Sequence, residues 1–258
     1  MPGPFLSLEV KGLLIDLDGT LYVEGEPIRA CREALAKLRS SGLLLRFVTN
    51  TTRKPRREVL FGLRRMGFEA EEAEIFTPAR AAALVLRDRR CYPLVNDSLL
   101  EDLEGMVTDD ESPEYVLVGD LGEGFTYARL DAAFRHLMGG AELLALQKNR
   151  YWRRESGLSL DAGPFVTALE YASGKTATVV GKPEKDFFRL ALEDLGDLRS
   201  SEVAMVGDDP EADVAGAKDM GLKGVQVKTG KYDAAVGDVG EADLLLESFA
   251  GLPEALGL

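Results

Sequence analysis

The sequence predicts an α/β protein whose core is a doubly wound parallel sheet, with a second α/β domain inserted into it. Four predicted helices each end at a glycine, and short apolar runs of strand-like composition alternate with them. Polar residues directly follow several of those runs. Such alternation is typical of a parallel sheet with helices on both faces, a Rossmann-like architecture that binds ligands at the carboxyl ends of its strands.

The predicted core elements come from both ends of the chain. A buried strand is expected at 13–15, immediately before an acidic turn. The other predicted strands are 44–48, 203–206 and 224–227. The predicted helices are 30–41, 56–66, 186–195 and 210–220. The glycine after each helix supplies the left-handed residue that commonly ends one.

The middle of the chain has its own β/α alternation. Its predicted strands are 91–95, 115–118 and 142–147, and its predicted helices are 78–87, 127–138 and 164–172. A block of this size can bury a separate core. We therefore predict a core domain from residues 1–79 and 177–258, interrupted by an inserted domain at 80–176.

The overall composition excludes several classes of protein. The chain has 258 residues, of which 45% are hydrophobic and 29% charged, as in a globular protein with a full core. A net charge of −13 argues against a general binder of nucleic acid or anionic membranes, since both need a basic face. No apolar run reaches the roughly eighteen residues of a membrane span, and no signal peptide is evident. A cytoplasmic location is the default expectation.

Cysteine and histidine are too scarce to form most catalytic or metal sites. Cys31 and Cys91 could pair, but two free thiols in a reducing compartment are the favoured interpretation. The single histidine, His136, falls at the end of a predicted helix, where an imidazole commonly interacts favourably with the helix dipole. Any acid–base chemistry is therefore expected of carboxylates.

Asp16 and Asp18 are the most informative residues of the chain. They follow the first buried strand, and their spacing leaves both side chains on one side of an extended backbone. Two like charges this close repel each other unless a cation or a shared proton relieves them. Two turn-forming aspartates beside Gly19 are the alternative. We favour chemistry over stability as the reason for the pair.

Other polar groups follow later strands of the predicted sheet. Thr49, Asn50 and Thr51 follow one strand, Asp208 and Asp209 follow another, and Lys182 follows the apolar run 177–181. If all these strands share one sheet, their polar ends converge on one crevice. Taken singly, each group has an ordinary alternative. Thr49, Asn50 and Thr51 could form a turn before the helix that starts near Pro55, and Lys182 could be a surface lysine. Asp213, which follows Asp209 closely, could belong to the acidic first turn of a helix.

Taken together, these segments resemble the four ordered motifs of the haloacid dehalogenase superfamily. The matching segments are Asp16-Leu17-Asp18-Gly19-Thr20-Leu21, Val48-Thr49-Asn50-Thr51-Thr52, Gly181-Lys182-Pro183, and Gly207-Asp208-Asp209 with Asp213. The inserted block between the second motif and the lysine resembles the class with a large α/β cap, class IIA. Segments 163–171 and 179–185 are also similar to phosphatases of that class.

The resemblance implies a Mg²⁺-dependent phosphatase. Asp16 would be the nucleophile that attacks phosphorus and forms an aspartyl-phosphate. Asp18 would protonate the leaving oxygen and later accept a proton from water. Mg²⁺ would be held by Asp16, the backbone carbonyl of Asp18, and Asp208.

The remaining motif residues would support this chemistry. Thr49, Asn50 and Thr51 would bind the phosphate, and Lys182 would steady the nucleophile and the transferred phosphoryl group. Asp209 would lie in the outer shell of the metal, and Asp213 would support the lysine or the metal-bound waters. The acidic first turn of a helix explains Asp213 equally well.

The substrate and the partners stay open at this stage. The resemblance favours a small phosphorylated metabolite, with inorganic pyrophosphate or a P–N bond, as in phospholysine or phosphohistidine, as the alternative. A non-catalytic phospho-ligand-binding protein is a further alternative, which the joint presence of the motif acids and Lys182 disfavours. Relatives often form a homodimer through the cap. The basic, aromatic run 147–154 reads either as a solvated hairpin, which we favour, or as a substrate contact.

Overall fold

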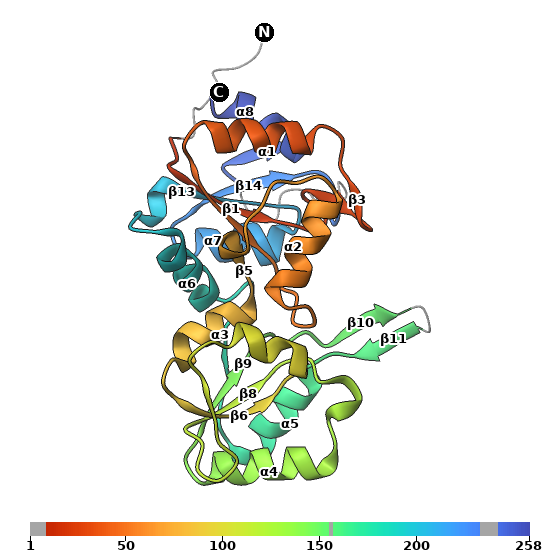
Figure 1. Cartoon of the computed structure of the whole chain (residues 1–258), viewed down its shortest axis with the longest axis vertical. Coiled ribbons are helices and arrows are strands. Elements are labelled where there is room, and N and C mark those ends of the chain that lie inside the picture. Colours follow the sequence, from red (N-terminus) through yellow and green to blue (C-terminus); the bar gives the residue numbers. More distant parts are fainter. Residues whose placement is uncertain (1–8, 155–156, 233–241) are drawn as a thin grey trace. The chain divides into compact units, whose positions relative to one another are not determined.

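The computed structural model describes residues 9–154, 157–232 and 242–258. The chain forms two compact units (Figure 1). The first unit comprises Met1–Thr49, Arg56–Phe76 and Lys182–Leu258, and the second comprises Asn50–Pro55 and Thr77–Gly181. The predicted division at residues 80 and 176 stays a prediction, and each unit is described by itself.

The first unit contains a six-stranded parallel sheet in the order β15-β14-β13-β1-β4-β5. Its strands are β1 (Gly12–Asp16), β4 (Leu44–Val48), β5 (Ile75–Phe76), β13 (Val203–Gly207), β14 (Lys223–Val227) and β15 (Leu244–Leu246). Every residue of β1 is buried, which explains why its sequence is apolar without alternation. A small antiparallel pair, β2 (Tyr22–Val23) and β3 (Glu26–Pro27), follows the loop after β1.

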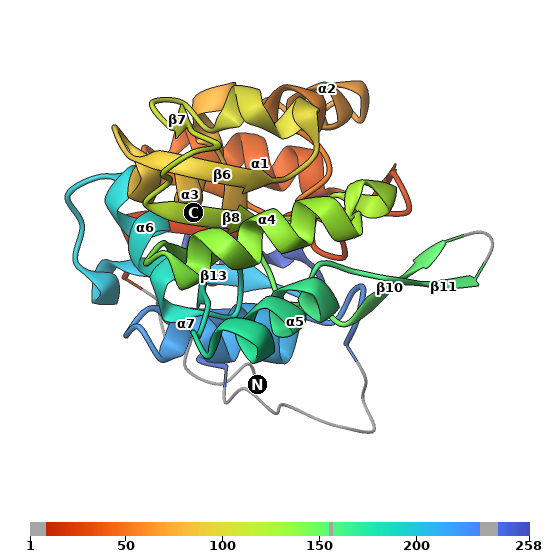
Figure 2. The same cartoon turned by 90° about the horizontal axis from the view of Figure 1, so that it is seen from below.

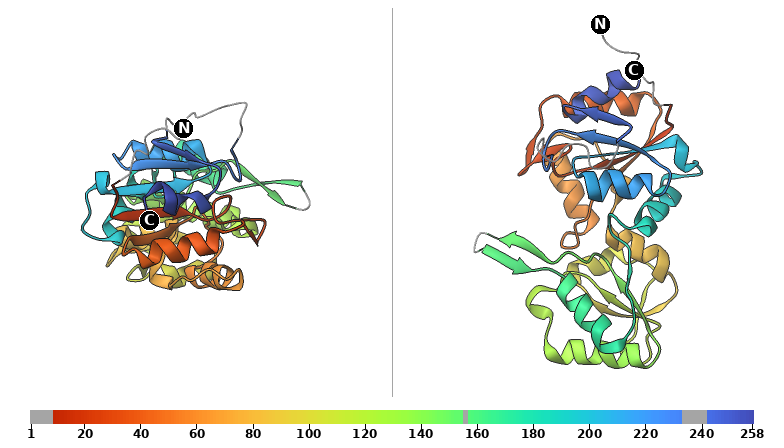
Figure 3. Two further views of the ribbon diagram at one scale, coloured as in Figure 1. Left: turned by 90° about the horizontal axis from the view of Figure 1, so that it is seen from above. Right: turned by 180° about the vertical axis from the view of Figure 1, so that it is seen from behind.

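Helices cover both faces of this sheet (Figures 1 and 3). They are α1 (Cys31–Ser40), α2 (Arg56–Arg65), α6 (Lys185–Leu195), α7 (Gly216–Lys218) and α8 (Leu252–Ala255). Leu13 and Ile15 of β1 belong to one core cluster to which α1, α2 and α8 contribute side chains. On the other face, Phe187 of α6 packs edge-on against Phe76, with ring centroids 5.4 Å apart. The prediction of a doubly wound sheet is confirmed.

One predicted helix has a different form. The segment expected to be helical at 210–220 consists of a π-helical turn, Pro210–Ala215, followed by the short α7. The N–H groups of Asp213 and Val214 both donate to the carbonyl of Asp209, at 3.0 and 3.4 Å, and the second of these bonds spans five residues. Single π-helical turns of this kind are frequent at functional sites.

The second unit contains a five-stranded parallel sheet in the order β12-β9-β8-β6-β7. The strands are β6 (Arg90–Leu94), β7 (Val107–Thr108), β8 (Tyr115–Val118), β9 (Glu142–Ala145) and β12 (Thr178–Val179). Helices α4 (Tyr127–Met138) and α5 (Gly163–Ser173) lie together on one face, and α3 (Pro78–Leu86) lies on the other (Figure 2). The predicted α/β insertion therefore has its own sheet and its own core.

The strand before Lys182 lies outside the core sheet. The convergence of the polar clusters was conditional on their strands sharing one sheet, and this strand does not meet the condition, because β12 pairs with β9 in the sheet of the second unit. A run of only two strand residues has no pattern of its own that could assign it to one sheet or the other. Lys182 nevertheless belongs to the first unit.

The cysteines and the histidine lie where the sequence predicted. Cys31 and Cys91 are buried free thiols, and burial raises their pKa values to about 11 and about 12. His136 lies in the last turn of α4 with its ring 5.0 Å from that of Tyr92. Among the described residues, no helix combines the length and the apolar character that crossing a membrane requires.

Candidate active site

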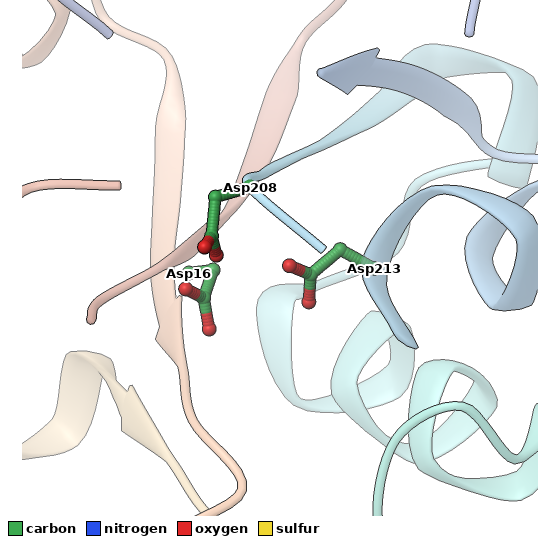
Figure 4. Close-up of side chains that lie close together, drawn as sticks. All are labelled: Asp16, Asp208 and Asp213. Atoms are coloured by element: carbon green, nitrogen blue, oxygen red, sulfur yellow. The ribbon is translucent and has the colours of Figure 1, made fainter. Parts of the chain in front are cut away.

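Three buried carboxylates meet at the carboxyl end of the central strands of the first unit (Figure 4). Asp16, Asp208 and Asp213 each offer an oxygen within 4.8 Å of the others. Asp16 is the last residue of β1 and Asp208 follows β13 directly. Because Ile15 pairs with Val206 in the parallel register, the two strands end side by side and bring these carboxylates together.

Lys182 supplies a buried ammonium group to this cluster. Its Nζ lies 2.5 Å from Oδ1 of Asp16 and 2.6 Å from Oδ1 of Asp213. The whole lysine is only 7% exposed, so the interpretation as a surface lysine is wrong. Asp213 is likewise buried, at 1% exposure, and is more than the acidic start of a helix.

The charges in the cluster are mutually dependent. Burial raises the pKa of Asp16, although Lys182 acts in the opposite direction. Burial also raises the pKa of Asp208 to about 6 and that of Asp213 to about 7. Burial alone would lower the pKa of Lys182, but the two carboxylates that it contacts raise it, so the ammonium stays charged. One ammonium does not balance three carboxylates, and a bound cation would relieve the remaining repulsion.

The donor atoms fit Mg²⁺. Carboxylate oxygens are the ligands that this ion prefers, and octahedral metal–oxygen distances of about 2.0–2.1 Å place adjacent ligand oxygens roughly 3 Å apart and opposite ones roughly 4 Å apart. The oxygens of the three carboxylates lie within 4.8 Å of one another, which is compatible with that spacing. Both oxygens of Asp213 accept hydrogen bonds, Oδ1 from the ammonium of Lys182 and Oδ2 from the N–H of Asp209.

Two glycines allow the carboxylates to come this close. A Cβ atom on Gly207 would lie 2.2 Å from Oδ2 of Asp213, and one on Gly19 would lie 2.2 Å from Oδ2 of Asp208. Gly19 also has a φ of +90°, which side chains rarely allow. Neither glycine can therefore be replaced without displacing an acidic group of the cluster.

Asp18 is placed differently from the expectation. The extended backbone does not continue through Asp18, because β1 ends at Asp16. A turn follows, in which the N–H of Leu21 donates a hydrogen bond to the carbonyl of Leu17 at 2.9 Å. The side chain of Asp18 is exposed and lies outside the cluster of three buried carboxylates. Asp18 is therefore on the loop beside the cluster, where its carboxyl group is accessible to solvent.

The predicted phosphate-binding residues follow β4. Asp16 pairs with Val48 in the register between β1 and β4, so Thr49 is the next residue after the strand partner of Asp16. The N–H of Thr49 donates to the carbonyl of Phe76 at 3.2 Å. Asn50 and Thr51 belong to the second unit, where Arg53 of the same segment pairs with the buried Asp120.

Asp209 has a structural explanation of its own. Its Oδ1 accepts hydrogen bonds from the N–H groups of Glu211 and Ala212, at 3.1 and 2.9 Å, so it caps the π-helical turn. Its Oδ2 pairs with the ammonium of Lys231 at 2.9 Å. Burial would raise the pKa of Asp209, but these hydrogen bonds and the lysine lower it.

Sequence reasoning missed the residues that follow β14. Thr229, Gly230 and Lys231 contact the Gly19 loop, Asp208 and Asp209. One signal was available: this Thr-Gly-Lys run begins two residues after the end of a predicted strand of the core sheet.

The basic, aromatic run at 147–154 is part of a hairpin, as favoured. Strands β10 (Tyr151–Arg154) and β11 (Gly157–Leu160) pair antiparallel and project from the second unit (Figure 1). The hairpin is fixed at its base by the buried Gln147, whose amide donates to Asp161. A contact between this hairpin and a substrate stays the alternative interpretation of the run.

Known proteins match the chain over most of its length. The model for haloacid dehalogenase-like hydrolases matches residues 13–107, and a second model, for HAD-hydrolase-like domains, matches residues 179–252. Haloacid dehalogenase-like hydrolase domain-containing protein 2 of Rattus norvegicus is 47% identical, over 88% of this chain and 87% of its own. Phospholysine phosphohistidine inorganic pyrophosphate phosphatase of Danio rerio is 43% identical, over 86% and 84%.

Solved structures match the whole fold. The p-nitrophenyl phosphatase of Archaeoglobus fulgidus superposes with a TM-score of 0.87 at 29% identity, over 96% of this chain and 100% of its own. The 4-nitrophenylphosphatase of Thermotoga maritima gives 0.85 at 25% identity, over 96% and 98%. Together with the site, these similarities show that the chain belongs to the haloacid dehalogenase-like hydrolases and is a phosphatase of that superfamily.

Proposed function

We propose that the protein is a Mg²⁺-dependent phosphohydrolase that acts through an aspartyl-phosphate on a small phosphorylated metabolite. The observation that carries the proposal is the buried cluster in which Asp16 lies beside Asp208 and in contact with Lys182. A nucleophilic carboxylate needs neighbouring positive charge, because the phosphate that it attacks is also an anion. The cluster offers one fixed ammonium and oxygen ligands for one cation.

In the first step, a carboxylate oxygen of Asp16 attacks phosphorus while the bond to the leaving oxygen breaks. Lys182 holds Asp16 in place and offsets part of the negative charge on the incoming group. Asp18 gives its proton to the leaving oxygen. Mg²⁺, when bound by Asp16, Asp208 and the carbonyl of Asp18, would neutralise charge on the transferred phosphoryl group.

In the second step, water attacks the phosphorus of the aspartyl-phosphate. Asp18, now a carboxylate, takes a proton from that water, and the bond between phosphorus and Asp16 breaks to release phosphate. Thr49, Asn50 and Thr51 are proposed to bind the phosphoryl oxygens through hydroxyl, amide and backbone N–H groups. Residues 80–176 are proposed to choose the substrate, and a homodimer formed through them is part of the same proposal.

The proposal predicts a reaction that depends strictly on the metal. Phosphate release from p-nitrophenyl phosphate is expected with Mg²⁺ and should fall by roughly 100-fold or more in EDTA, because a bound cation contributes several kcal/mol to phosphoryl transfer. Adding excess Mg²⁺ should restore the rate. Circular dichroism of the EDTA-treated protein provides the control for folding. An undiminished rate in EDTA would count against the proposed mechanism.

A second substrate class is favoured by one comparison. The similarity to phospholysine phosphohistidine inorganic pyrophosphate phosphatase makes pyrophosphate and compounds with a P–N bond the alternative substrates. A panel of phosphorylated metabolites that includes pyrophosphate, phospholysine and phosphohistidine would rank these substrates by kcat/KM. A preference of tenfold or more for the last three would replace the metabolite proposal.

Asp18→Asn is expected to slow the reaction in a manner that depends on the leaving group. An amide cannot protonate the departing oxygen, so alkyl phosphates should lose roughly 10²- to 10⁴-fold in kcat. The loss should be smaller for p-nitrophenyl phosphate, because p-nitrophenolate leaves without a proton. The measurement is kcat against leaving-group pKa for both proteins. Parallel lines in that plot would contradict the role of Asp18 as the acid.

A further inference from the structure

Three residues that follow β14 contact both sides of the candidate metal site. Thr229, Gly230 and Lys231, here called the 229–231 segment, lie beside the loop after β1 and the loop after β13. We propose that this segment positions the two groups that hold Mg²⁺ on either side, the Asp18 carbonyl and the Asp208 carboxylate. This inference rests on the proposed function and assigns positioning residues to it.

The first contact fixes the loop that carries Asp18. The hydroxyl of Thr229 donates a hydrogen bond to the carbonyl of Gly19, and the N–H of Gly19 donates to the carbonyl of Tyr22 at 2.7 Å. The N–H of Gly19 and the carbonyl of Asp18 share one planar peptide group and point in opposite directions. Holding Gly19 at both its N–H and its carbonyl therefore sets the direction of the Asp18 carbonyl.

The second contact fixes the carboxylate of Asp208. The backbone N–H of Lys231 donates to Oδ2 of Asp208 at 2.6 Å. Gly230, at a φ of +65°, lies so close that a Cβ atom there would be 2.1 Å from this same oxygen and 2.6 Å from the Cα of Gly19. Oδ2 is thus enclosed by two glycines and an N–H group, which leaves Oδ1 as the oxygen for the cation.

The third contact joins the segment to the loop after β13. The ammonium of Lys231 pairs with Oδ2 of Asp209, whose other oxygen caps the π-helical turn that carries Asp213. The segment therefore bonds to Gly19 in the loop after β1 and to Asp208 and Asp209 in the loop after β13. Groups that orient metal ligands in this way commonly change metal affinity 10- to 100-fold when they are removed.

Thr229→Val tests the inference, because valine keeps the branched shape and lacks the hydroxyl. Isothermal titration calorimetry with Mg²⁺ alone, without substrate, is expected to give a Kd weaker by about 10- to 100-fold. Thr229→Ser keeps the donor and should bind Mg²⁺ within about threefold of the unaltered chain. Thr229→Ala lacks the hydroxyl without adding a methyl group, and it should match Thr229→Val even if valine does not fit. Thr108→Val, at an exposed threonine of β7, is the matched control.

Activity gives an independent measurement. At saturating Mg²⁺, Thr229→Val should recover most of the kcat of the unaltered chain, because the hydroxyl orients a ligand and does not touch the reacting atoms. Equal Mg²⁺ affinity of Thr229→Val, Thr229→Ala and the unaltered chain would overturn the inference and leave the proposed function standing. An equal loss in Thr229→Ser would also overturn it. An unaltered chain that neither binds nor needs Mg²⁺ would overturn both.

Discussion

Asp16→Asn is expected to reduce the hydrolysis of p-nitrophenyl phosphate by roughly 10³-fold or more in kcat. The asparagine amide has nearly the same shape but no negative oxygen with which to attack phosphorus. Acid-quenched reactions analysed by intact-protein mass spectrometry should show a phosphoryl adduct on the unaltered chain and none on the variant. These two readouts together test the covalent route.

The stability of the same variant separates chemistry from folding. Asp16 shares Lys182 with Asp213, and it lies near Asp208, whose charge opposes its own. Removing one of these acids leaves Lys182 paired with Asp213, so the Tm of Asp16→Asn should not fall below that of the unaltered chain. Asp197→Asn, at an exposed aspartate, is the matched control. A kcat close to that of the unaltered chain would contradict the assignment of Asp16 as the nucleophile.

Lys182→Met is expected to lose both activity and stability. The lysine side chain is 4% exposed and those of its partners are 10% and 1% exposed, so solvent does little to screen the two carboxylates left behind. Removing one partner of a buried ion pair typically costs about 3–5 kcal/mol. Urea denaturation at pH 7.5 without metal should show a loss of that size in the free energy of unfolding.

The loss in Lys182→Met should shrink as the pH falls. The pKa of Asp213 is raised to about 7 in the folded chain even with Lys182 present, against 3.8 for an unperturbed aspartate. Between those pH values, the folded state binds more protons than the unfolded state, so lowering the pH stabilises it. Without the ammonium, this pKa rises further and the effect becomes larger.

Two variants serve as controls for this prediction. Lys185→Met removes an exposed lysine nearby and should leave the free energy of unfolding nearly unchanged. Combining Lys182→Met with Asp213→Asn removes one of the stranded carboxylates and should recover part of the stability, while activity stays low. If Lys182→Met alone unfolds at the same urea concentration as the unaltered chain, the buried network contributes little to stability.

Local sequence patterns predicted the framework of the site well. The apolar runs that became β1 and β13 are buried on both faces, and those of β4 and β14 are mostly buried, so each could be recognised from a few neighbouring residues. Parallel strands end at one edge of the sheet, which is why Asp16 and Asp208 were expected to meet. The convergence of these acids required no knowledge of side-chain contacts.

Other features depend on contacts that a local pattern does not contain. In the π-helical turn at Pro210–Ala215, two N–H groups donate to the same carbonyl, that of Asp209. Helix propensities do not distinguish this hydrogen-bond pattern from that of an α-helix. The contact of Thr229 with Gly19 joins residues 210 positions apart. A turn at Gly19 was expected from the sequence, but the spacing of the two acids did not show that the extended backbone already ends at Asp16.

The discontinuity of the first unit also bears on how the protein is made. A ribosome releases β1 with Asp16 early, yet the neighbouring strand β13 and the ammonium of Lys182, 166 residues further along, emerge only after the entire second unit. Until then, Asp16 lacks its counter-ion and β1 has one unpaired edge, which is prone to association. A product that terminates before residue 182 would therefore be inactive and poorly soluble, however well its second unit folds.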